Sequence, residues 1–295
     1  MKIGATFPTT EIGDDPAIIR DWIQTAEGLG YDYVLTYDHV LGAEHADREP
    51  KLTGPYTEKH PFHEPFVLYA WMAGITQRIE LCTGIIILPQ RQTALVAKQV
   101  AELAILSGDR IRLGLGTGWS HVEYEALGVP YDKRGRRFDE QIEVLRALWT
   151  EDLVDFEGEY HRIDRANILP RPKNPIPLWF GAMSKVAVER AIRVGDGLIF
   201  AAPPAMLKNM VGRARDGLEA NGRDAAAFGL ETHVDFSQGE AAWSDSLAEW
   251  AELGGTHLSL RAMNTGNDRM GLGTHDYGGP RGYIDALETF MKAVR

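Results

Sequence analysis

Hydrophobic residues along this chain follow two alternating spacings. Short, mostly apolar runs of five to ten residues are each followed by a longer stretch in which apolar residues recur every three or four positions. The first spacing is typical of a buried strand and the second of an amphipathic helix. The short runs lie at residues 3–7, 33–38, 79–88, 110–116, 177–182, 197–202, 228–236 and 256–262.

A helical pattern follows each of these runs. Asp15-Pro16 predicts the start of the first helix, because aspartate is a good N-cap and proline fits the first helical position. Eight strand–helix units in order predict a parallel sheet, and at this length one closed (β/α)₈ barrel over residues 1–295. An open, doubly wound sheet is the alternative. The other helical patterns begin near Pro65 and Thr93 or cover residues 138–149, 186–194, 206–220, 243–253 and 283–294.

Four insertions interrupt this alternation. Residues 39–64, 117–135 and 262–281 each follow a strand. We therefore expect these loops at the C-terminal face of the barrel, where the active sites of such barrels lie. Residues 151–176 follow a helix instead, and the FEGEYHRI stretch within them predicts a small hairpin.

Composition favours a globular protein of the cytoplasm. Hydrophobic residues make up 44% of the 295 and charged residues 25%, as in ordinary soluble domains. The single cysteine, Cys82, excludes an internal disulfide framework and fits a reducing compartment. The N-terminus reads as a strand start, and no apolar stretch reaches the ~18–20 residues that span a bilayer. We expect no membrane partner.

The formal net charge of −11 argues against nucleic acid as a partner, because such binding uses clustered cations. One basic run, Lys133–Arg137, stands out against this acidic background. It is either a solvated helix start or a contact for an anionic ligand.

Three glycines at alternate positions, Gly114, Gly116 and Gly118, close the fourth strand. Their GxGxG spacing differs from the GxGxxG of a dinucleotide fold, and no helix opens directly behind them. The glycines either make a tight exit from the strand or let a flat or phosphorylated ligand approach the backbone.

Residues 83–163, which include TGIIILPQRQ and GLGTGWSHVEYEALG, resemble the bacterial luciferase-like family of flavin- and F420-dependent oxidoreductases. KIGATFP, TYDH and PLWFGAMSKVAVERAIRVGDGLI extend the resemblance over most of residues 1–202. It is weak over the last third, where substrate contacts vary. The resemblance implies a small-molecule substrate at the barrel mouth and a homodimer formed through helices around 65–77 and 93–106.

The resemblance also assigns a cofactor site. It places a non-proline cis peptide at Gly84–Ile85, behind the cofactor ring, and the ring itself beside the glycine turn. The cofactor phosphate is expected at the helix N-terminus after the fifth strand, where Ser184 can add a hydroxyl or can cap its own helix instead. The residues assigned to cofactor binding are Asp38, His39, Gly84, Ile85, Gly116, Thr117, Gly118, Trp119, Gly181, Ala182, Met183 and Ser184.

Within that set, Asp38 and His39 are expected beside the reactive edge of the ring. Imidazole exchanges protons near neutral pH, so His39 is the candidate catalytic residue that manages the proton when a hydride moves. A hydrogen bond that caps the loop is the alternative role. His60 and His63 lie in the same loop, but their spacing is not that of metal ligands, and we expect no metal site.

The expected cofactor is coenzyme F420, with FMN as the second choice. The GTGW turn, the LPQR stretch and the basic run are similar to the F420-using branch, whose cofactor carries a phosphate and an anionic tail. One departure argues against sugar-phosphate oxidation: Trp119 stands where the F420-dependent sugar-phosphate dehydrogenases of the family carry a catalytic glutamate. Besides hydride transfer with F420, FMN-dependent monooxygenation and non-catalytic flavin binding remain open.

Overall fold

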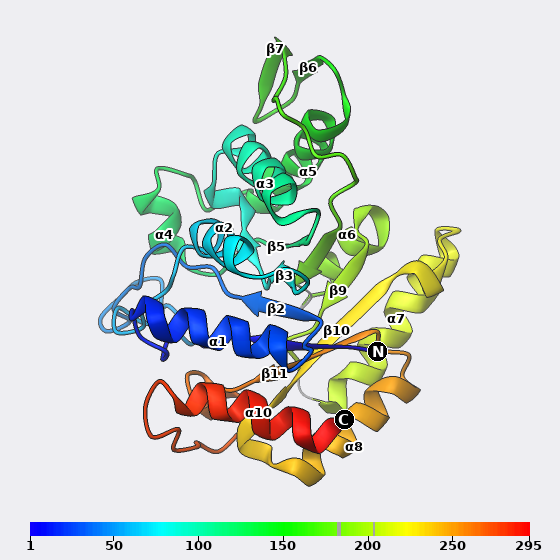
Figure 1. Cartoon of the computed structure of the whole chain (residues 1–295). Helices are drawn as coiled ribbons and strands as arrows, with labels where there is room; N and C mark the ends of the chain where they lie inside the picture. The colour runs from blue at the N-terminus through cyan, green and yellow to red at the C-terminus, as the bar shows by residue number, and fades with distance from the viewer. Residues whose placement is uncertain (182–183, 203) are drawn as a thin grey trace.

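Eight parallel strands form a closed ring in the computed structural model, which describes residues 1–181, 184–202 and 204–295 (Figure 1). Neighbouring strands pair in chain order, and the last pairs with the first. The ring confirms the predicted (β/α)₈ barrel. Its strands are β1 (Lys2–Thr6), β2 (Tyr33–Thr36), β3 (Glu80–Thr83), β5 (Ile111–Gly116), β8 (Leu178–Gly181), β9 (Gly197–Ile199), β10 (Gly229–Asp235) and β11 (His257–Arg261).

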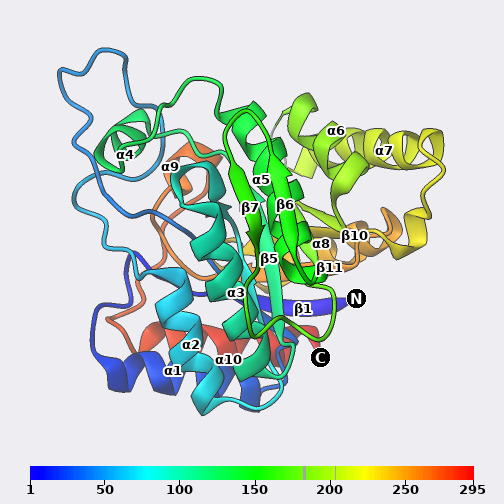
Figure 2. The same ribbon diagram turned by 90° about the horizontal axis from the view of Figure 1, so that it is seen from above.

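One long helix follows each strand of the ring and packs outside it (Figure 2). The first begins as predicted, because Asp15 accepts a hydrogen bond from the Ala17 amide and Pro16 occupies the first turn. In the described ranges no helix is long and apolar enough to cross a membrane. These helices are α1 (Pro16–Gly28), α2 (Pro65–Ile75), α3 (Thr93–Ser107), α5 (Arg134–Thr150), α6 (Lys185–Val194), α7 (Pro204–Ala220), α8 (Glu240–Glu252) and α10 (Gly282–Val294).

Smaller elements decorate the barrel. The predicted hairpin is present as the antiparallel pair β6 (Val154–Glu157) and β7 (Arg162–Ala166), which projects from one end of the molecule in Figure 1. The chain termini lie near one another on the opposite side (Figures 1 and 2). Short elements within the insertions and connections are β4 (Ile86–Ile87), α4 (His121–Ala126), α9 (Asn267–Met270) and the 3₁₀ turns at Leu88–Gln90, Ala225–Ala227 and Phe236–Gln238.

The predicted continuous strand at residues 79–88 is wrong. Regular structure stops at Thr83, resumes for Ile86–Ile87 and then turns into the 3₁₀ segment. The Ile87 amide donates to the carboxylate of Asp38 at 2.9 Å, so this part of the chain is bound by a side chain from the end of β2. Hydrophobicity alone does not reveal such a partner, because both faces of the run are buried anyway.

The predicted loop at residues 117–135 contains one short helix, α4. Ser120 caps it by accepting a hydrogen bond from the Glu123 amide. The loop prediction missed this helix because its six residues are too few to display an apolar stripe. The helix matters because it carries Glu123 into the site described next.

Inside the barrel, the N-terminal end is filled by a buried ion cluster. Arg112 donates to Glu231 at 2.7 Å and also bonds Glu80. Its guanidinium lies 4.1 Å from the ring centroid of Trp179 and 4.7 Å from that of Tyr33. Cation–π contacts of this kind suit a desolvated arginine.

Candidate active site at the C-terminal mouth of the barrel

The carboxyl ends of three strands bring most of the sequence-assigned residues together. Gly84 and Ile85 follow β3. Gly116 is the last residue of β5 and is followed by residues 117–119, and Gly181 is the last residue of β8. β4 pairs with β5, and β5 pairs with β8, so these strand ends are neighbours. All of these residues are half-buried, whereas the strands that lead to them are largely buried. They line a surface that solvent reaches at the mouth.

The Gly84–Ile85 peptide bond is cis, as expected from the resemblance. The Ile85 side chain lies against the backbone of the two neighbouring strands: a Cβ on Gly116 would stand 2.6 Å from its Cδ1, and one on Gly181 would stand 3.2 Å from its Cγ2. Glycine at these strand ends therefore leaves backbone, and no side chain, around Ile85. A planar ring system fits such a surface.

His39 stands beside this surface and is held by Glu123. Nδ1 of His39 lies 2.7 Å from Oε2 of Glu123. The other carboxylate oxygen, Oε1, accepts from the amides of Val40 and Leu41 at 2.7 and 3.2 Å. Helix α4 thus fixes both the imidazole and the backbone that follows it (Figure 2 shows α4 beside the long loop after β2).

Glu123 has no exposed surface, yet its pKa is lowered. Burial alone would raise the pKa of this carboxyl, but the hydrogen bond and charge of His39 and the two backbone donors outweigh it. Glu123 is therefore an ionised carboxylate at neutral pH. An ionised carboxylate can only accept, so Nδ1 of His39 carries a proton and Nε2 is the nitrogen left for chemistry.

Aromatic rings enclose the imidazole of His39 on several sides. Its centroid lies 5.0 Å from that of Phe62, 5.2 Å from that of Tyr56 and 5.4 Å from that of Trp119. Gly54 allows the loop to close over Trp119, since a Cβ there would overlap the indole ring. The side chain of His39 retains 7% exposure. Nε2 of His39 forms no hydrogen bond with the described residues. It is also not one of the buried polar atoms without a partner, so it is the nitrogen that solvent or a ligand can reach.

The side chain of Asp38 is expected to face the mouth, but in the structure it is turned into the protein. The carboxylate is buried, and it pairs with Arg91 at 2.7 Å through Oδ1 and with the Ile87 amide through Oδ2. Arg91 in turn bonds Glu64, the N-cap of α2. Asp38 thus joins β2 to β4 and to the start of α2, and any contact of its own with a cofactor stays a prediction.

The expected phosphate site is described only in part. Ser184 is exposed and caps α6 by accepting from the Ala187 amide at 3.3 Å. The capping role is therefore present, and it leaves the hydroxyl at the helix N-terminus, where an anion would bind. Ala182 and Met183 lie outside the described residues.

Two other groups of candidates already contact partners within the protein. In the basic run, the Arg134 guanidinium lies 3.8 Å from the Tyr131 ring centroid, and Arg137 donates to the Pro130 carbonyl. His60 accepts from the Thr57 amide, and His63 bonds the Gly13 carbonyl. The described ranges hold no group of three or more side chains suited to a metal ion.

Sequence reasoning missed Glu123 and Arg91, although both residues lie within the stretch that carries the resemblance. A weak signal existed for Glu123, which stands three residues after a serine N-cap, as in a capping box. No spacing rule links position 39 to position 123 or position 38 to position 91, because these pairs form only when the barrel closes.

Comparisons with known proteins found a family profile, related sequences and structures of the same fold. The profile of the luciferase-like monooxygenase family matches residues 1–289. An uncharacterized protein of Mycobacterium tuberculosis (strain ATCC 25618 / H37Rv) is 34% identical over 215 residues, which are 72% of this chain and 74% of that protein. An F420-dependent glucose-6-phosphate dehydrogenase of Kineococcus radiotolerans is 30% identical over 249 residues, covering 81% of this chain and 69% of the relative.

A solved structure shares the fold at low sequence identity. The F420-dependent secondary alcohol dehydrogenase in complex with an F420–acetone adduct superimposes with a TM-score of 0.76 at 19% identity, over 100% of this chain and 99% of that one.

Proposed function

Because this chain belongs to the luciferase-like monooxygenase family, we propose that it is an F420-dependent oxidoreductase that transfers a hydride between the cofactor and a small organic substrate. F420 supplies a ring carbon that accepts or gives a hydride. The relatives at 30–31% identity include F420-dependent glucose-6-phosphate dehydrogenases, which supports F420 over FMN.

One observation carries the proposal: an accessible imidazole nitrogen stands beside a surface at the barrel mouth that the Ile85 side chain and the backbone of two glycine strand ends form. Gly116 and Gly181 leave room for the Ile85 side chain against their backbone, and Nε2 of His39 forms no hydrogen bond with the described residues. Gly84, Ile85 and the turn from Gly116 to Trp119 would hold the ring. The α6 N-terminus with Ser184 would hold the phosphate.

His39 supplies the acid–base chemistry in this proposal. When a substrate hydroxyl is oxidised, its carbon gives up a hydride and its oxygen gives up a proton, and Nε2 takes that proton. Glu123 stabilises the imidazolium that forms. In the reverse direction Nε2 returns the proton to the carbonyl oxygen as the hydride reaches the carbon. The aromatic rings around His39 leave only 7% of its side chain exposed and so limit the access of water to the imidazole.

Titration of the purified protein with F420 and with FMN in separate experiments tests the cofactor assignment. We expect F420 to bind at micromolar concentration or tighter and FMN to bind more weakly. Micromolar FMN binding with no detectable F420 binding would reverse the assignment and favour FMN-dependent monooxygenation. A bound cofactor that no compound in a broad substrate screen reduces or oxidises would favour non-catalytic flavin binding.

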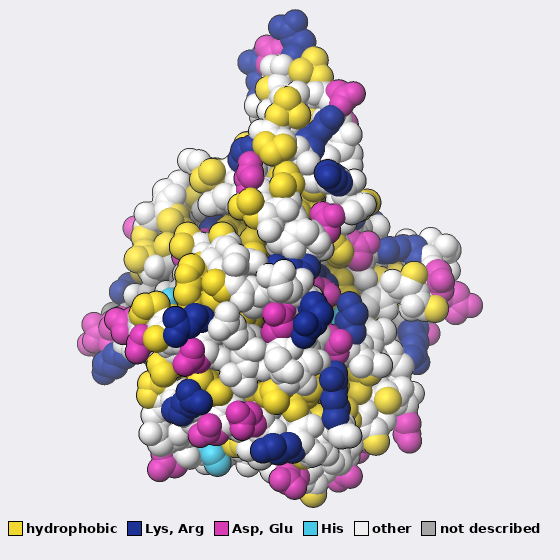
Figure 3. All heavy atoms as spheres, in the orientation of Figure 1, with side chains coloured by type: hydrophobic (Ala, Val, Ile, Leu, Met, Phe, Trp, Pro, Cys, Tyr) yellow, Lys and Arg dark blue, Asp and Glu magenta, His cyan; other side chains and the backbone are white. Residues whose placement is uncertain are grey.

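We also propose a homodimer. Apolar side chains remain exposed on α2 and α3, and Figure 3 shows hydrophobic side chains gathered over this part of the surface. Continuous exposed apolar surface on one face is typical of a subunit interface. The exposed large hydrophobic side chains on the two helices are Val67, Trp71, Leu95, Ile105 and Leu106. The buried free thiol of Cys82 supports a reducing compartment such as the cytoplasm for this assembly.

A further inference from the structure

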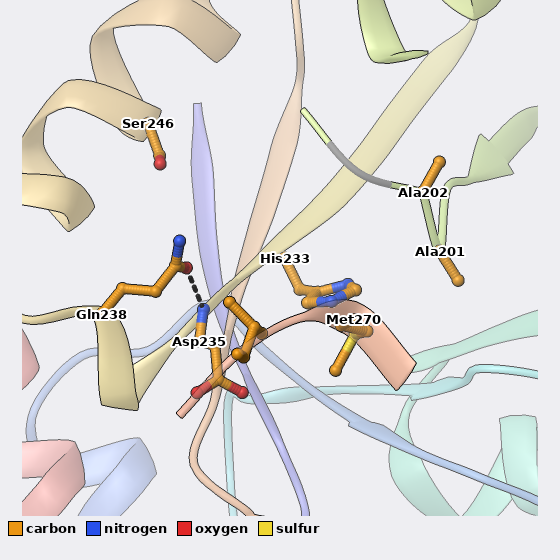
Figure 4. A pocket seen from close by; sticks show the side chains of 8 residues that line it. Ala201, Ala202, His233, Asp235, Gln238, Ser246 and Met270 are labelled. Carbon is orange, nitrogen blue, oxygen red and sulfur yellow. Dashed lines mark hydrogen bonds between the residues drawn. The ribbon is translucent and has the colours of Figure 1, made fainter. Parts of the chain in front are cut away.

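A pocket opens at the C-terminal face, next to the ends of β9 and β10. Its volume is about 100 Å³. Figure 4 shows the imidazole of His233 beside the Met270 side chain, with Ala201 and Ala202 on another wall. An apolar cavity of about 150 Å³ accepts benzene, so this pocket has room for about four non-hydrogen atoms. The lining residues are Ala201, Ala202, His233, Asp235, Gln238, Ser246, Met270 and Leu272.

His233 is a neutral imidazole in this pocket. Burial, and next the charge of Arg261, lower the pKa of His233 to about 4, although Asp235 opposes the shift. The two ring nitrogens of His233 form no hydrogen bond with the described residues. Neither is one of the buried polar atoms without a partner, so both can reach a ligand in the pocket. One nitrogen can donate and the other can accept, which suits a carbonyl or a hydroxyl group equally.

The charge of Asp235 is already compensated. Its Oδ2 pairs with Arg261, and its Oδ1 accepts from Ser237 at 2.6 Å. Arg261 is itself buried and also bonds the Met263 carbonyl at 3.0 Å. No lining residue that the structure describes therefore offers a cation to a phosphate or a carboxylate. A buried anion without a cationic partner is strongly disfavoured.

From these observations we infer that the pocket is the substrate subsite, and that it takes an uncharged group of about four non-hydrogen atoms. That group carries one hydroxyl or carbonyl hydrogen-bonded to His233, in addition to the hydroxyl or carbonyl that reacts at His39. Ala201, Ala202, Met270 and Leu272 contact the apolar part of that group. This inference rests on the proposed function, since it supplies the substrate class for the same mouth. The uncharged substrate class would distinguish this chain from the relatives named as glucose-6-phosphate dehydrogenases.

The test compares uncharged and anionic probes on the protein loaded with F420. 1,3-Butanediol and 2,4-pentanediol represent the uncharged class, because one hydroxyl can react at His39 while the other bonds His233. Glucose 6-phosphate and glycerol 3-phosphate represent the anionic class. Binding is measured by calorimetry and turnover by the absorbance of F420. We expect an uncharged probe to bind, and its kcat/KM to exceed that of either phosphate ester by at least about 100-fold, because the site has no partner for the phosphate.

Variants assign the effect to His233. His233→Phe should weaken binding of the uncharged probe about tenfold, the effect of one lost hydrogen bond, while F420 affinity stays unchanged. His233→Asn keeps a donor and an acceptor and should restore part of the loss, which also guards against a misfolded phenylalanine variant. Ser244→Ala, at an exposed position of α8, is the matched control and should behave as wild type.

Failure of the two proposals looks different. If the wild-type protein does not bind F420, the proposed function itself is overturned. Normal F420 binding with a preference for the phosphate esters, or with no binding of either uncharged alcohol, would overturn the substrate subsite alone. Uncharged probes that bind equally well to wild type and His233→Phe would remove His233 from the site.

Discussion

The imidazole of His39 and the carboxylate of Glu123 meet at 2.7 Å, although 83 residues separate them in the chain. Glu123 is fully buried, and the hydrogen bonds that it accepts lower its pKa and keep it ionised. The pair resembles the base–orienter arrangement of many acid–base sites, in which a carboxylate sets the tautomer of a histidine. Two predictions separate the role of the imidazole from that of the carboxylate.

Replacing His39 by alanine removes the proposed proton carrier. We expect F420 affinity to stay within a few fold of wild type and the hydride-transfer rate to fall by ~10²–10⁴, the usual contribution of general acid–base catalysis. Stopped-flow measurement of F420 reduction at matched cofactor saturation checks this. A histidine that merely caps its loop would instead lower stability by about 1 kcal/mol and leave the rate of the folded protein unchanged.

Replacing Glu123 by glutamine keeps the shape but removes the charge that holds His39. We expect a rate loss of about 10- to 100-fold with F420 affinity within a few fold of wild type, because an amide stabilises the imidazolium formed during turnover less than a carboxylate does. Glu125→Gln, at an exposed position of the same helix, is the control. An E123Q protein whose folded fraction reacts at the wild-type rate would indicate a purely structural role.

Asp38 is expected to matter for stability. Asp38→Ala leaves Arg91 without its buried partner and the Ile87 amide without an acceptor, so unfolding should become easier by about 3 kcal/mol. Glu64→Gln removes the more exposed partner of Arg91 and should change stability by about 1 kcal/mol or less. Urea denaturation measures both. A folded Asp38→Ala protein of normal stability that no longer binds F420 would place Asp38 at the cofactor instead.

His257 should make the protein less stable in mild acid. Burial, and next the charge of Arg112, lower the pKa of His257 to about 3 from its ordinary value of 6.5. Between these values the unfolded chain binds a proton that the native protein does not, so stability falls as the pH drops, by up to about 1.4 kcal/mol per pH unit. His257→Gln should flatten the stability profile between about pH 6.5 and 5. An unchanged slope would contradict a neutral His257.

The proposed homodimer predicts a mass in solution of twice the 32.8 kDa chain. Val67→Glu combined with Leu106→Glu places charges on the exposed faces of α2 and α3 and should give monomers in light scattering at micromolar concentration. Val186→Glu, an equally exposed apolar position on α6, is the control and should remain dimeric. A wild-type protein that is monomeric at this concentration would refute the dimer.

The pattern of apolar residues was enough to predict the barrel. Each strand–helix unit encodes its own spacing, as with the run that became β5 and the stripe Phe138, Ile142 and Leu145 on α5. Local spacing is a property of adjacent residues, and eight such units leave few ways to bury all their apolar faces. The resemblance added the position of His39 and of the cis peptide at Gly84–Ile85, because both lie in short, recognisable motifs.

Tertiary structure alone decided which polar groups meet. The sequence placed Asp38 and His39 side by side, but alternate side chains leave a strand end in different directions, so one contacts Arg91 and the other Glu123. Likewise His233 gained its role as an uncharged group because barrel closure buried it beside Arg261. Burial and charge at a site depend on residues far away in the chain, and no local pattern encodes them.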